Sequence, residues 1–489
     1  MLESIKKMLD CFEKYNIEYC HWKSNEHLEE ALLGDTDLDI LFNPEQRNLL
    51  EKVLSEAGLK RFRATPLMQY NAIEDYIGFD KKKAKIWHLH LHYRLSLGEK
   101  HLKSYTVSWT NYILSRRYKD KKNDIYLSNT EDEYFLLLIR MALKLRMRDF
   151  GKKIGKDDIV EINWLQQRCD KKKVISIAEY LIDKEVGIEI EKLLKINLKN
   201  KNQLLNLQKI LRKKMNLYSS YNDLVIRLKR SIRELFWLSG GIKRRLGVSS
   251  VNPSRRISPA GGTVVAILGC DGAGKSTIIS YLTKEFNKKI DVYSTYLGSG
   301  DGSSSFVRKP MKLVAKKVGG RGVGHAVEKE LDLGKKITIK SRLYSLAKII
   351  WAVTLAIEKK NKLKDITRAR NNGLLVLIDR YPQVEVFGYS DGPLLSKYAR
   401  KSGIIKKIAD WEYNIYASAY INPPDLLVKL TVPTDIAIKR KPEMTAEEIE
   451  NKKNVVNLIH CKNEEIVVNT NQELIKSISF IMESIWKKI

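Results

Sequence analysis

GCDGAGKS, residues 269–276, decides the fold of this chain. Its pattern, GxxxxGK followed by Ser, is that of a phosphate-binding loop, or P-loop. The apolar segment TVVAILG precedes it at 263–269, and STIISYLTKEF at 276–286 has helical periodicity. Glycines let backbone N–H groups converge on phosphate oxygens, and the N-terminus of a helix adds positive potential. The stretch therefore predicts a strand, a loop that binds a nucleoside triphosphate, and a helix in succession.

The side chains of this loop have separate predicted roles. Lys275 is expected to reach the β- and γ-phosphates, the Ser276 hydroxyl to ligate Mg²⁺, and Thr277 to support the α-phosphate. ATP and Mg²⁺ are therefore the expected cofactors. A chance glycine turn is the alternative, and the flanking strand and helix argue against it. The predicted nucleotide-binding residues of the loop are Gly269, Asp271, Gly272, Ala273, Gly274, Lys275, Ser276 and Thr277.

A second apolar strand, GLLVLIDRY at 373–381, ends in charged residues. A carboxylate held beside Mg²⁺ by a rigid strand is what such a site requires, and Asp379 is placed to supply it. Arg380 would then project at the carboxyl edge of the sheet, where phosphate groups lie. Lys275, Asp379 and Arg380 are the predicted catalytic residues, and a surface Asp–Arg pair is the alternative.

A third strand, PPDLLVKLTVP at 423–433, leads into a cationic segment. We expect a helix to begin there at Ile436. Lys439, Arg440 and Lys441 on this helix could close over the triphosphate as a lid, and a solvated basic helix is the alternative.

GCDGAGKST, LLVLIDRY and PDLLVKLTVPTDIAIKR, in this order, resemble the thymidylate kinase family of P-loop kinases. The resemblance covers about residues 263–489 and implies a doubly wound parallel sheet and phosphoryl transfer from Mg-ATP. It further implies that Asp271 approaches the hydroxyls of the acceptor and that Arg380 holds its phosphate. It assigns Lys439, Arg440 or Lys441 to the lid.

The acceptor half of the family pattern is rewritten. Where the family has an Arg-Glu-Pro-Gly loop, this chain has YLGSGDG at 296–302. Where a thymine-reading helix follows the DRY motif, it has PQVEVFG at 382–388. We therefore expect a kinase whose acceptor is not thymidylate but a saccharide, a glycan end or another nucleotide.

GDTDLDIL at 34–41 is a second group of candidate functional residues. Alternate residues of a strand share one face, so Asp37 and Asp39 could bind a divalent metal together with a triphosphate. Upstream, a strand at 19–23 ends before Ser24, which is expected to cap the next helix. This spacing resembles the nucleotidyltransferase fold over about residues 15–130, with Lys23-Ser24 in place of Gly-Ser.

The nucleotidyltransferase pattern requires a third carboxylate on a later strand. The candidate strand, IWHLHLHYRL at 86–95, instead places His88, His90 and His92 on one face and leucines on the other. Neutral imidazole is a common metal ligand, so the three histidines are candidate ligands. They could equally form a polar face packed on the helical segment. Whether the domain transfers nucleotidyl groups or only binds nucleotide stays open.

Four regions follow from these patterns. Residues 1–130 mix strands and helices, 131–247 are helical, and 248–262 have the Ser, Pro, Gly and Arg composition of a linker. From 263 to 489, strands and helices alternate, which predicts a parallel sheet. The predicted fold class is α/β. A doubly wound P-loop sheet follows an α+β nucleotidyltransferase-like domain and a helical middle segment, in which Gly240-Gly241 is expected to end a helix.

Composition limits the remaining possibilities. The chain has 489 residues, 43% of them apolar, and five cysteines without a CxxC pair. We therefore expect neither disulfides nor a zinc knuckle, and a cytoplasmic location. The N-terminus lacks the pattern of a signal peptide, and SLAKIIWAVTLAI at 345–357 is too short and too charged to span a bilayer.

The net charge of +30 allows three interpretations. The chain could bind a polyanion, either nucleic acid or an anionic membrane surface. It could hold a phosphorylated substrate, or its lysines could simply be solvated. The alternative to a kinase is accordingly a nucleotide-gated switch or ATPase that responds to such a polyanion. The oligomeric state is not predicted.

Overall fold

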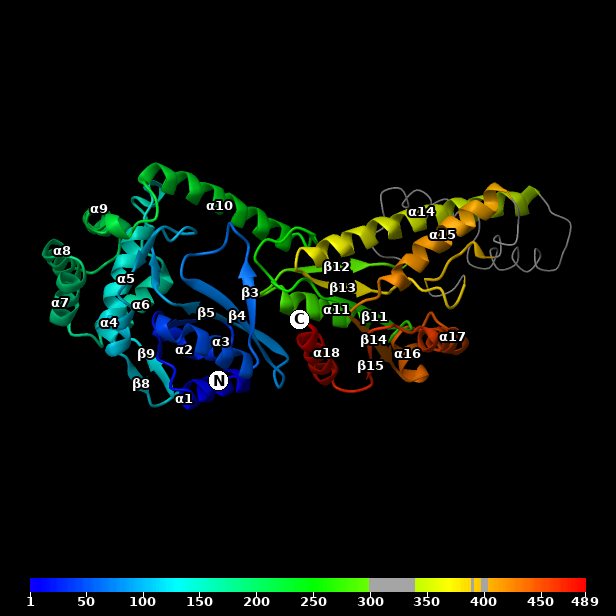
Figure 1. Ribbon diagram of the computed structural model, residues 1–489, viewed down its shortest axis with the longest axis horizontal. Coiled ribbons are helices and arrows are strands. Elements are labelled where there is room, and N and C mark those ends of the chain that lie inside the picture. The colour runs from blue at the N-terminus through cyan, green and yellow to red at the C-terminus, as the bar shows by residue number, and fades with distance from the viewer. Residues whose placement is uncertain (299–338, 388–390, 397–402) are drawn as a thin grey trace. The chain divides into compact units, whose positions relative to one another are not determined.

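The computed structural model describes residues 1–298, 339–387, 391–396 and 403–489 (Figure 1). Residues 299–302 and Gly388, which belong to the two rewritten acceptor stretches, lie outside the described residues. The chain forms two compact units. The N-terminal unit comprises Met1–Val248 and Ser254–Pro259, and the P-loop unit comprises Ser249–Pro253 and Ala260–Ile489.

An eight-stranded mixed sheet organises the N-terminal unit, in the order β10-β3-β4-β5-β2-β1-β9-β8. Strands β2 and β5 are parallel neighbours, and β4 and β5 form an antiparallel pair. The leucines of β5 pack in a core with α1 and α3, so the histidines between them face the other way. The strands are β1 (Tyr19–His21), β2 (Leu38–Phe42), β3 (Lys60–Ala64), β4 (Ile73–Asp80), β5 (Lys85–His92), β8 (Tyr118–Asp120), β9 (Ile125–Leu127) and β10 (Arg256–Ile257), with β6 (Leu95–Leu97) and β7 (Tyr105–Val107) forming a separate pair.

The segment predicted as a linker is only partly a linker. Within it, β10 pairs antiparallel with β3, Arg256 opposite Ala64. A strand of two residues is too short to show an alternating pattern in the sequence, so it could not be predicted.

Helices α6, α7 and α9 pack around α5, which is buried along most of its length because EYFLLLIRMAL offers apolar residues to every side. Helix α10 continues through Gly240-Gly241, so the expected helix end is wrong. A Cβ on Gly240 would lie 3.3 Å from the Cβ of Ser254, so this glycine permits a close approach instead. The helices are α1 (Glu3–Lys14), α2 (Leu28–Leu32), α3 (Arg47–Glu56), α4 (Thr110–Ser115), α5 (Thr130–Lys144), α6 (Lys156–Gln166), α7 (Lys171–Leu181), α8 (Lys184–Lys195), α9 (Leu205–Lys214) and α10 (Asp223–Arg245), with the short 3₁₀ helix η1 (Asn25–His27) before α2.

The P-loop unit has a five-stranded sheet in the order β12-β13-β11-β14-β15. All four pairings are parallel, and the first strand of the unit, β11, lies in the centre. The predicted doubly wound parallel sheet is therefore confirmed. The strands are β11 (Val264–Gly269), β12 (Val292–Tyr296), β13 (Leu375–Asp379), β14 (Leu426–Thr431) and β15 (Glu464–Asn469).

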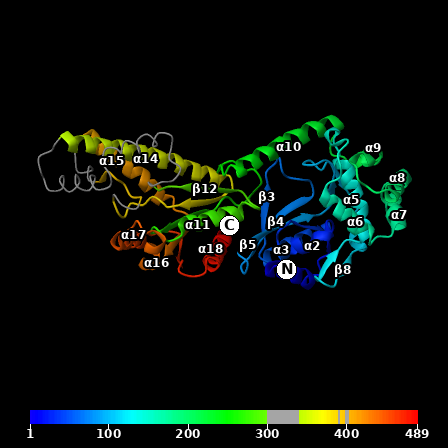
Figure 2. The same cartoon turned by 180° about the vertical axis from the view of Figure 1, so that it is seen from behind.

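Helices cover both faces of this sheet. Figures 1 and 2 show α14 and α15 on one face and α11 and α18 on the other. The apolar segment at 345–357 lies within α14. Within the described residues, no helix combines the length and the apolar character needed to cross a bilayer. The helices are α11 (Lys275–Phe286), α14 (Ile339–Asn371), α15 (Ile404–Ile421), α16 (Thr434–Arg440), α17 (Ala446–Leu458) and α18 (Leu474–Lys488).

Candidate functional sites

The P-loop connects the carboxyl end of the central strand β11 to the N-terminus of α11. Gly272 and Gly274 have φ angles of 80° and 85°, a left-handed conformation that side chains disfavour. A Cβ on Gly272 would lie only 2.7 Å from the carbonyl oxygen of Ala437. The loop therefore requires glycine at position 272 both for its backbone angle and for space.

Lys275 is folded over this loop. Its Nζ donates hydrogen bonds to the carbonyl oxygens of Gly269 at 2.9 Å and Cys270 at 2.8 Å. Burial lowers the pKa of Lys275, and the nearby positive charge of Arg380 adds to this effect. Ser276 and Thr277 are exposed in the first turn of α11, where backbone N–H groups have no partner within the helix. The loop thus presents one ammonium, two hydroxyls and a helix N-terminus.

Asp379 is the last residue of β13 and is paired with Ile267 of β11. Its Oδ1 is buried and has no hydrogen-bond partner in the described part of the chain. Burial raises the pKa of Asp379, and the charges of Lys275 and Arg380 oppose the shift. A buried carboxylate oxygen without a partner, at the strand end next to the P-loop, fits a Mg²⁺ ligand.

Arg380 links the P-loop to a buried ion pair. It has a φ of 66°, and its guanidinium lies 3.1 Å from Asp271 Oδ1 and 3.5 Å from Asp391 Oδ2. Asp391 in turn lies 3.5 Å from the Nζ of Lys359, a lysine of α14 that is 1% exposed. The sequence named Asp271 and Arg380 separately, and the structure brings them together. Asp391 and Lys359 were missed.

Asp271 also has a second cationic partner, Lys452 of α17. Burial alone would raise the pKa of Asp271, but the hydrogen bond from Lys452 and the charges of Lys452 and Arg380 outweigh it and lower the pKa. Asp271 is therefore an anion held between two cations.

The three candidate lid cations lie at the end of a helix, so the expected helix start at Ile436 is wrong. Helix α16 runs from Thr434 to Arg440 and stops there because Pro442 disfavours helical geometry at Lys441. Arg440 donates to the carbonyl oxygens of Gly272 and Thr470, both at 3.1 Å. Lys439 is exposed, and Lys441 lies 3.5 Å from Glu443. Of the three, Arg440 contacts the P-loop.

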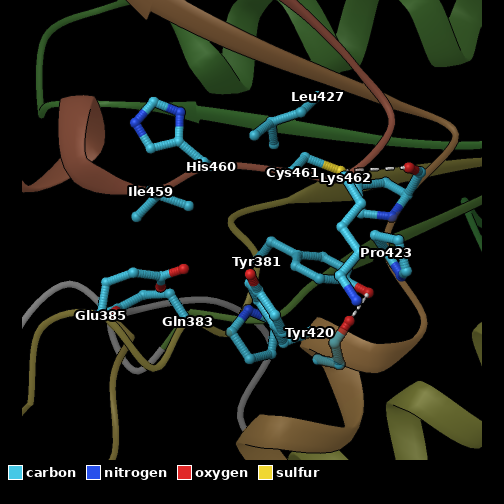
Figure 3. Close-up of a pocket in the computed structure, with 13 residues that line it drawn as sticks. Tyr381, Gln383, Glu385, Tyr420, Pro423, Leu427, Ile459, His460, Cys461 and Lys462 are labelled. Atoms are coloured by element: carbon cyan, nitrogen blue, oxygen red, sulfur yellow. Dashed lines mark hydrogen bonds between the residues drawn. The ribbon is translucent and has the colours of Figure 1, made fainter.

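Figure 3 shows a pocket that begins where the DRY motif ends. Tyr381 donates from its hydroxyl to the carbonyl oxygens of Ala419 at 3.1 Å and Asn422 at 2.7 Å. Gln383 bonds to the backbone of Val386 and thereby closes a local turn. None of the predicted phosphate-binding residues lines this pocket. Its lining residues are Tyr381, Pro382, Gln383, Glu385, Ala419, Tyr420, Pro423, Pro424, Leu427, Ile459, His460, Cys461 and Lys462.

In the N-terminal unit, β2 and β5 bring the predicted aspartates and histidines together. Asp39 pairs in register with His90. His90 Nδ1 lies 3.3 Å and His92 Nε2 3.2 Å from Asp39 Oδ1, and His88 Nδ1 lies 3.0 Å from Asp37 Oδ1. Asp39, His88 and His92 are buried. Asp39 is therefore not a solvent-exposed acid in a turn.

Three charged residues complete this cluster. Asp75 of β4 lies opposite His90, and its Oδ1 is 2.8 Å from His88 Nε2. Arg256 of β10 approaches the same oxygen at 2.7 Å, and Lys23 Nζ lies 2.9 Å from Asp39 Oδ1. Asp75 and Arg256 were missed by the sequence reasoning. The register of a β4–β5 hairpin would have placed Asp75 opposite His90.

The donor atoms of the cluster suit a metal ion other than Mg²⁺. Asp37, His88 and His90 form one group whose ligand atoms lie within 4.8 Å of one another, and Asp39, His90 and His92 form another. Imidazole with carboxylate suits zinc or other transition ions, whereas Mg²⁺ prefers oxygen. The expected Mg²⁺ at Asp37 and Asp39 therefore does not fit this donor set.

Ser24 does not cap the following helix. It has a φ of 57° and makes no side-chain capping bond to η1. The neighbouring Asn25 is buried instead and donates from its backbone and side chain to the carboxylate of Glu133, at 2.9 and 2.7 Å.

Fold and site together define the second unit as a P-loop domain. The comparisons with known proteins agree. The chain is 30% identical over 184 residues to the uncharacterized ATP-binding protein YghS of Escherichia coli K12, covering 37% of this chain and 73% of YghS, and it belongs to the same family. The uncharacterized ATP-binding protein YghR of the same strain is 29% identical over 203 residues, covering 40% of this chain and 75% of YghR. No protein-family model matches the chain.

Solved structures similar to this chain include two nucleoside and nucleotide kinases. Thymidylate kinase from Candida albicans aligns with 47% of this chain and 92% of its own, at 16% identity and a TM-score of 0.28. Deoxyadenosine kinase from M. mycoides with bound dCTP aligns with 46% of this chain and 99% of its own, at 16% identity and a TM-score of 0.24.

Proposed function

We propose that the P-loop unit is an ATP- and Mg²⁺-dependent phosphotransferase whose acceptor is not thymidylate. The observation that carries the proposal is the Asp271–Arg380 ion pair, which joins the P-loop to the end of β13 beside the buried Asp379. An anion and a cation are thereby placed next to the groups that would hold ATP. The ATP-binding names of YghS and YghR support the donor.

On the donor side, Lys275 would stabilise the phosphoryl group in transfer, and Ser276 and Asp379 would hold the metal. When bound, Mg²⁺ neutralises charge on the β- and γ-phosphates. Lys275 would exchange its hydrogen bonds to the carbonyl oxygens of Gly269 and Cys270 for phosphate oxygens. Arg440, which already contacts the loop at Gly272, is the lid cation we favour.

On the acceptor side, Arg380 would bind an anionic oxygen and Asp271 would accept a hydrogen bond from the reacting hydroxyl. These two side chains now bond to each other, so an acceptor with both a phosphate and a hydroxyl could replace the ion pair with two contacts. A phosphorylated saccharide, a phosphorylated glycan end and a nucleotide all have this chemistry.

The test is a transfer assay with the full chain. Purified protein and γ-labelled ATP are offered nucleotides, sugar phosphates and lipopolysaccharide, and label in each acceptor is measured. We expect ATP consumption to rise in proportion to one acceptor class. Slow ATP hydrolysis that responds to nucleic acid or anionic vesicles, with no labelled acceptor, would favour the nucleotide-gated switch.

The N-terminal unit has a second candidate function, the binding of a divalent metal with nucleotide. The observation behind it is the convergence of three histidines and two aspartates of β2, β4 and β5 with Asp37, which directly precedes β2. Metal content of the purified protein, before and after chelation, tests it. Nucleotidyl transfer remains a prediction that a metal-loaded assay with labelled nucleoside triphosphates would decide.

A cytoplasmic location is part of the proposal. The five cysteines are free thiols, which supports a reducing compartment.

A further inference from the structure

Helix α10 turns an apolar stripe toward solvent. Its members recur at three- and four-residue spacing and therefore share one face of the helix. Their exposed fractions run from 44% for Leu238 to 78% for Leu224. A helix on a globular protein ordinarily buries its apolar face, whereas α10 exposes it. The α10 stripe consists of Leu224, Leu228, Ile232, Leu235, Leu238 and Ile242, and Leu246 continues it at the C-cap of the helix.

Away from the stripe, buried Ile226 and several polar contacts hold α10 to the N-terminal unit. Arg233 donates to the carbonyl oxygen of Gln69 at 2.7 Å, and Arg146 lies 2.8 Å from Glu234. Near the other end, Arg244 donates to the hydroxyl of Ser254 at 3.2 Å. These contacts fix the rotation of the helix along its length. The outward direction of the stripe is therefore built into the unit.

Exposed cations flank the stripe on both sides. At 100° per residue, Arg227 and Arg245 lie along one edge, and Lys243 and Lys229 lie along the other. Within α10, all of which the structure describes, the acidic residues are Asp223 at the first turn and Glu234, which is paired with Arg146 and Arg148. The exposed face is thus apolar in the middle and positive at its edges.

We propose that α10 binds an anionic membrane surface, with its stripe in the boundary between headgroups and acyl chains. Leucine and isoleucine would enter the apolar region while lysine and arginine meet anionic headgroups, as in amphipathic helices that lie in the interface. The length supports this, because 23 residues give a stripe roughly 35 Å long. The inference is independent of the proposed phosphotransferase activity.

The charges at the edges of the stripe disfavour a second copy of the chain as the partner that covers it. Two such stripes packed face to face would bring cationic edges together in either orientation, and like charges repel. Nucleic acid would use the cations but leave the stripe without a role.

The experiment is cosedimentation of the full chain with vesicles of phosphatidylcholine, with or without about a third phosphatidylglycerol. We expect binding to the anionic vesicles at least about tenfold stronger than to phosphatidylcholine, and weaker at high salt. Leu228→Glu with Leu235→Glu should lower it at least about tenfold. The matched control, Val160→Glu with Ile188→Glu, adds the same charge at exposed aliphatic residues of α6 and α8 and should bind like the wild type. Circular dichroism confirms that both variants are folded.

Several results would overturn the proposal. Unchanged vesicle binding by the stripe variant would show that α10 does not contact the membrane. If the wild type does not bind the vesicles, a membrane is excluded as the partner of the stripe. In that case, a wild-type dimer that the stripe variant dissociates would identify a second copy as the occupant. A lowered melting temperature of the stripe variant alone would identify a contact within the chain, and retention on RNA would identify nucleic acid.

Discussion

Replacing Arg380 with alanine should impair the use of the acceptor far more than the binding of ATP. The guanidinium contacts Asp271 and Asp391, whereas Lys275 bonds to carbonyl oxygens of the P-loop itself. Alanine retains a Cβ, so the left-handed φ of 66° at this position is equally strained in both proteins. The substitution therefore removes the side-chain interaction without changing the backbone cost.

The size of the effect follows from the charges that remain. Asp271 keeps Lys452 and Asp391 keeps Lys359, so neither carboxylate loses its last cation. What is lost is a charge-assisted hydrogen bond to the acceptor, which contributes about 1.5–3 kcal/mol. At about 1.4 kcal/mol for each factor of ten, kcat/KM for the acceptor should fall by roughly 10- to 150-fold.

The assay measures initial rates against acceptor concentration at saturating ATP, and ATP affinity by calorimetry. Arg368→Ala, an arginine of α14 whose side chain is 69% exposed, is the matched control and should leave both quantities unchanged. ATP affinity of Arg380→Ala should stay within a few-fold of wild type. A large loss of ATP binding with unchanged acceptor kinetics would show that Arg380 serves the donor.

Three other predictions concern the P-loop backbone, the histidine–aspartate cluster and a buried acid. Gly272→Ala should reduce ATP affinity at least about tenfold, because a Cβ would lie 2.7 Å from the Ala437 carbonyl oxygen at a φ of 80°; calorimetry with an unchanged affinity would contradict this. Asp37→Asn with Asp39→Asn should abolish metal binding by the N-terminal unit and leave phosphotransfer intact, and equal metal content in mutant and wild type would refute the site. Burial, reinforced by Glu161 and Glu26, raises the pKa of Glu133 from 4.5 to about 8. The stabilisation from its bound proton is thus complete below the unfolded pKa and is lost as pH rises through about 8. Urea unfolding should show that Glu133→Gln loses less stability than wild type between about pH 5 and pH 8, and parallel losses would exclude Glu133 as the cause.

The P-loop and its sheet could be predicted because their signals are local. The loop, its strand and its helix are contiguous in sequence, and glycine spacing alone specifies the backbone that phosphate needs. The end of β13 at Asp379 could also be predicted from the sequence, because a run of apolar residues stops there.

Contacts between distant residues could not be predicted in this way. Asp391 meets Arg380, and Lys359 meets Asp391, through tertiary packing, and neither residue stands in a motif. Arg256 enters the N-terminal unit on a strand of two residues inside a segment whose composition indicates a linker. The Gly240-Gly241 pair misled because glycine serves both helix ends and close packing, and the sequence does not say which.

The central claim rests on Lys275, and turnover of ATP by Lys275→Ala tests it most directly. The matched control is Lys284→Ala, an exposed lysine in the last turn of the same helix. We expect Lys284→Ala to turn over ATP like the wild type and Lys275→Ala to be slower by roughly a hundredfold or more, with both variants folded. Wild-type turnover by Lys275→Ala would contradict the assignment of the P-loop as the site of phosphoryl transfer.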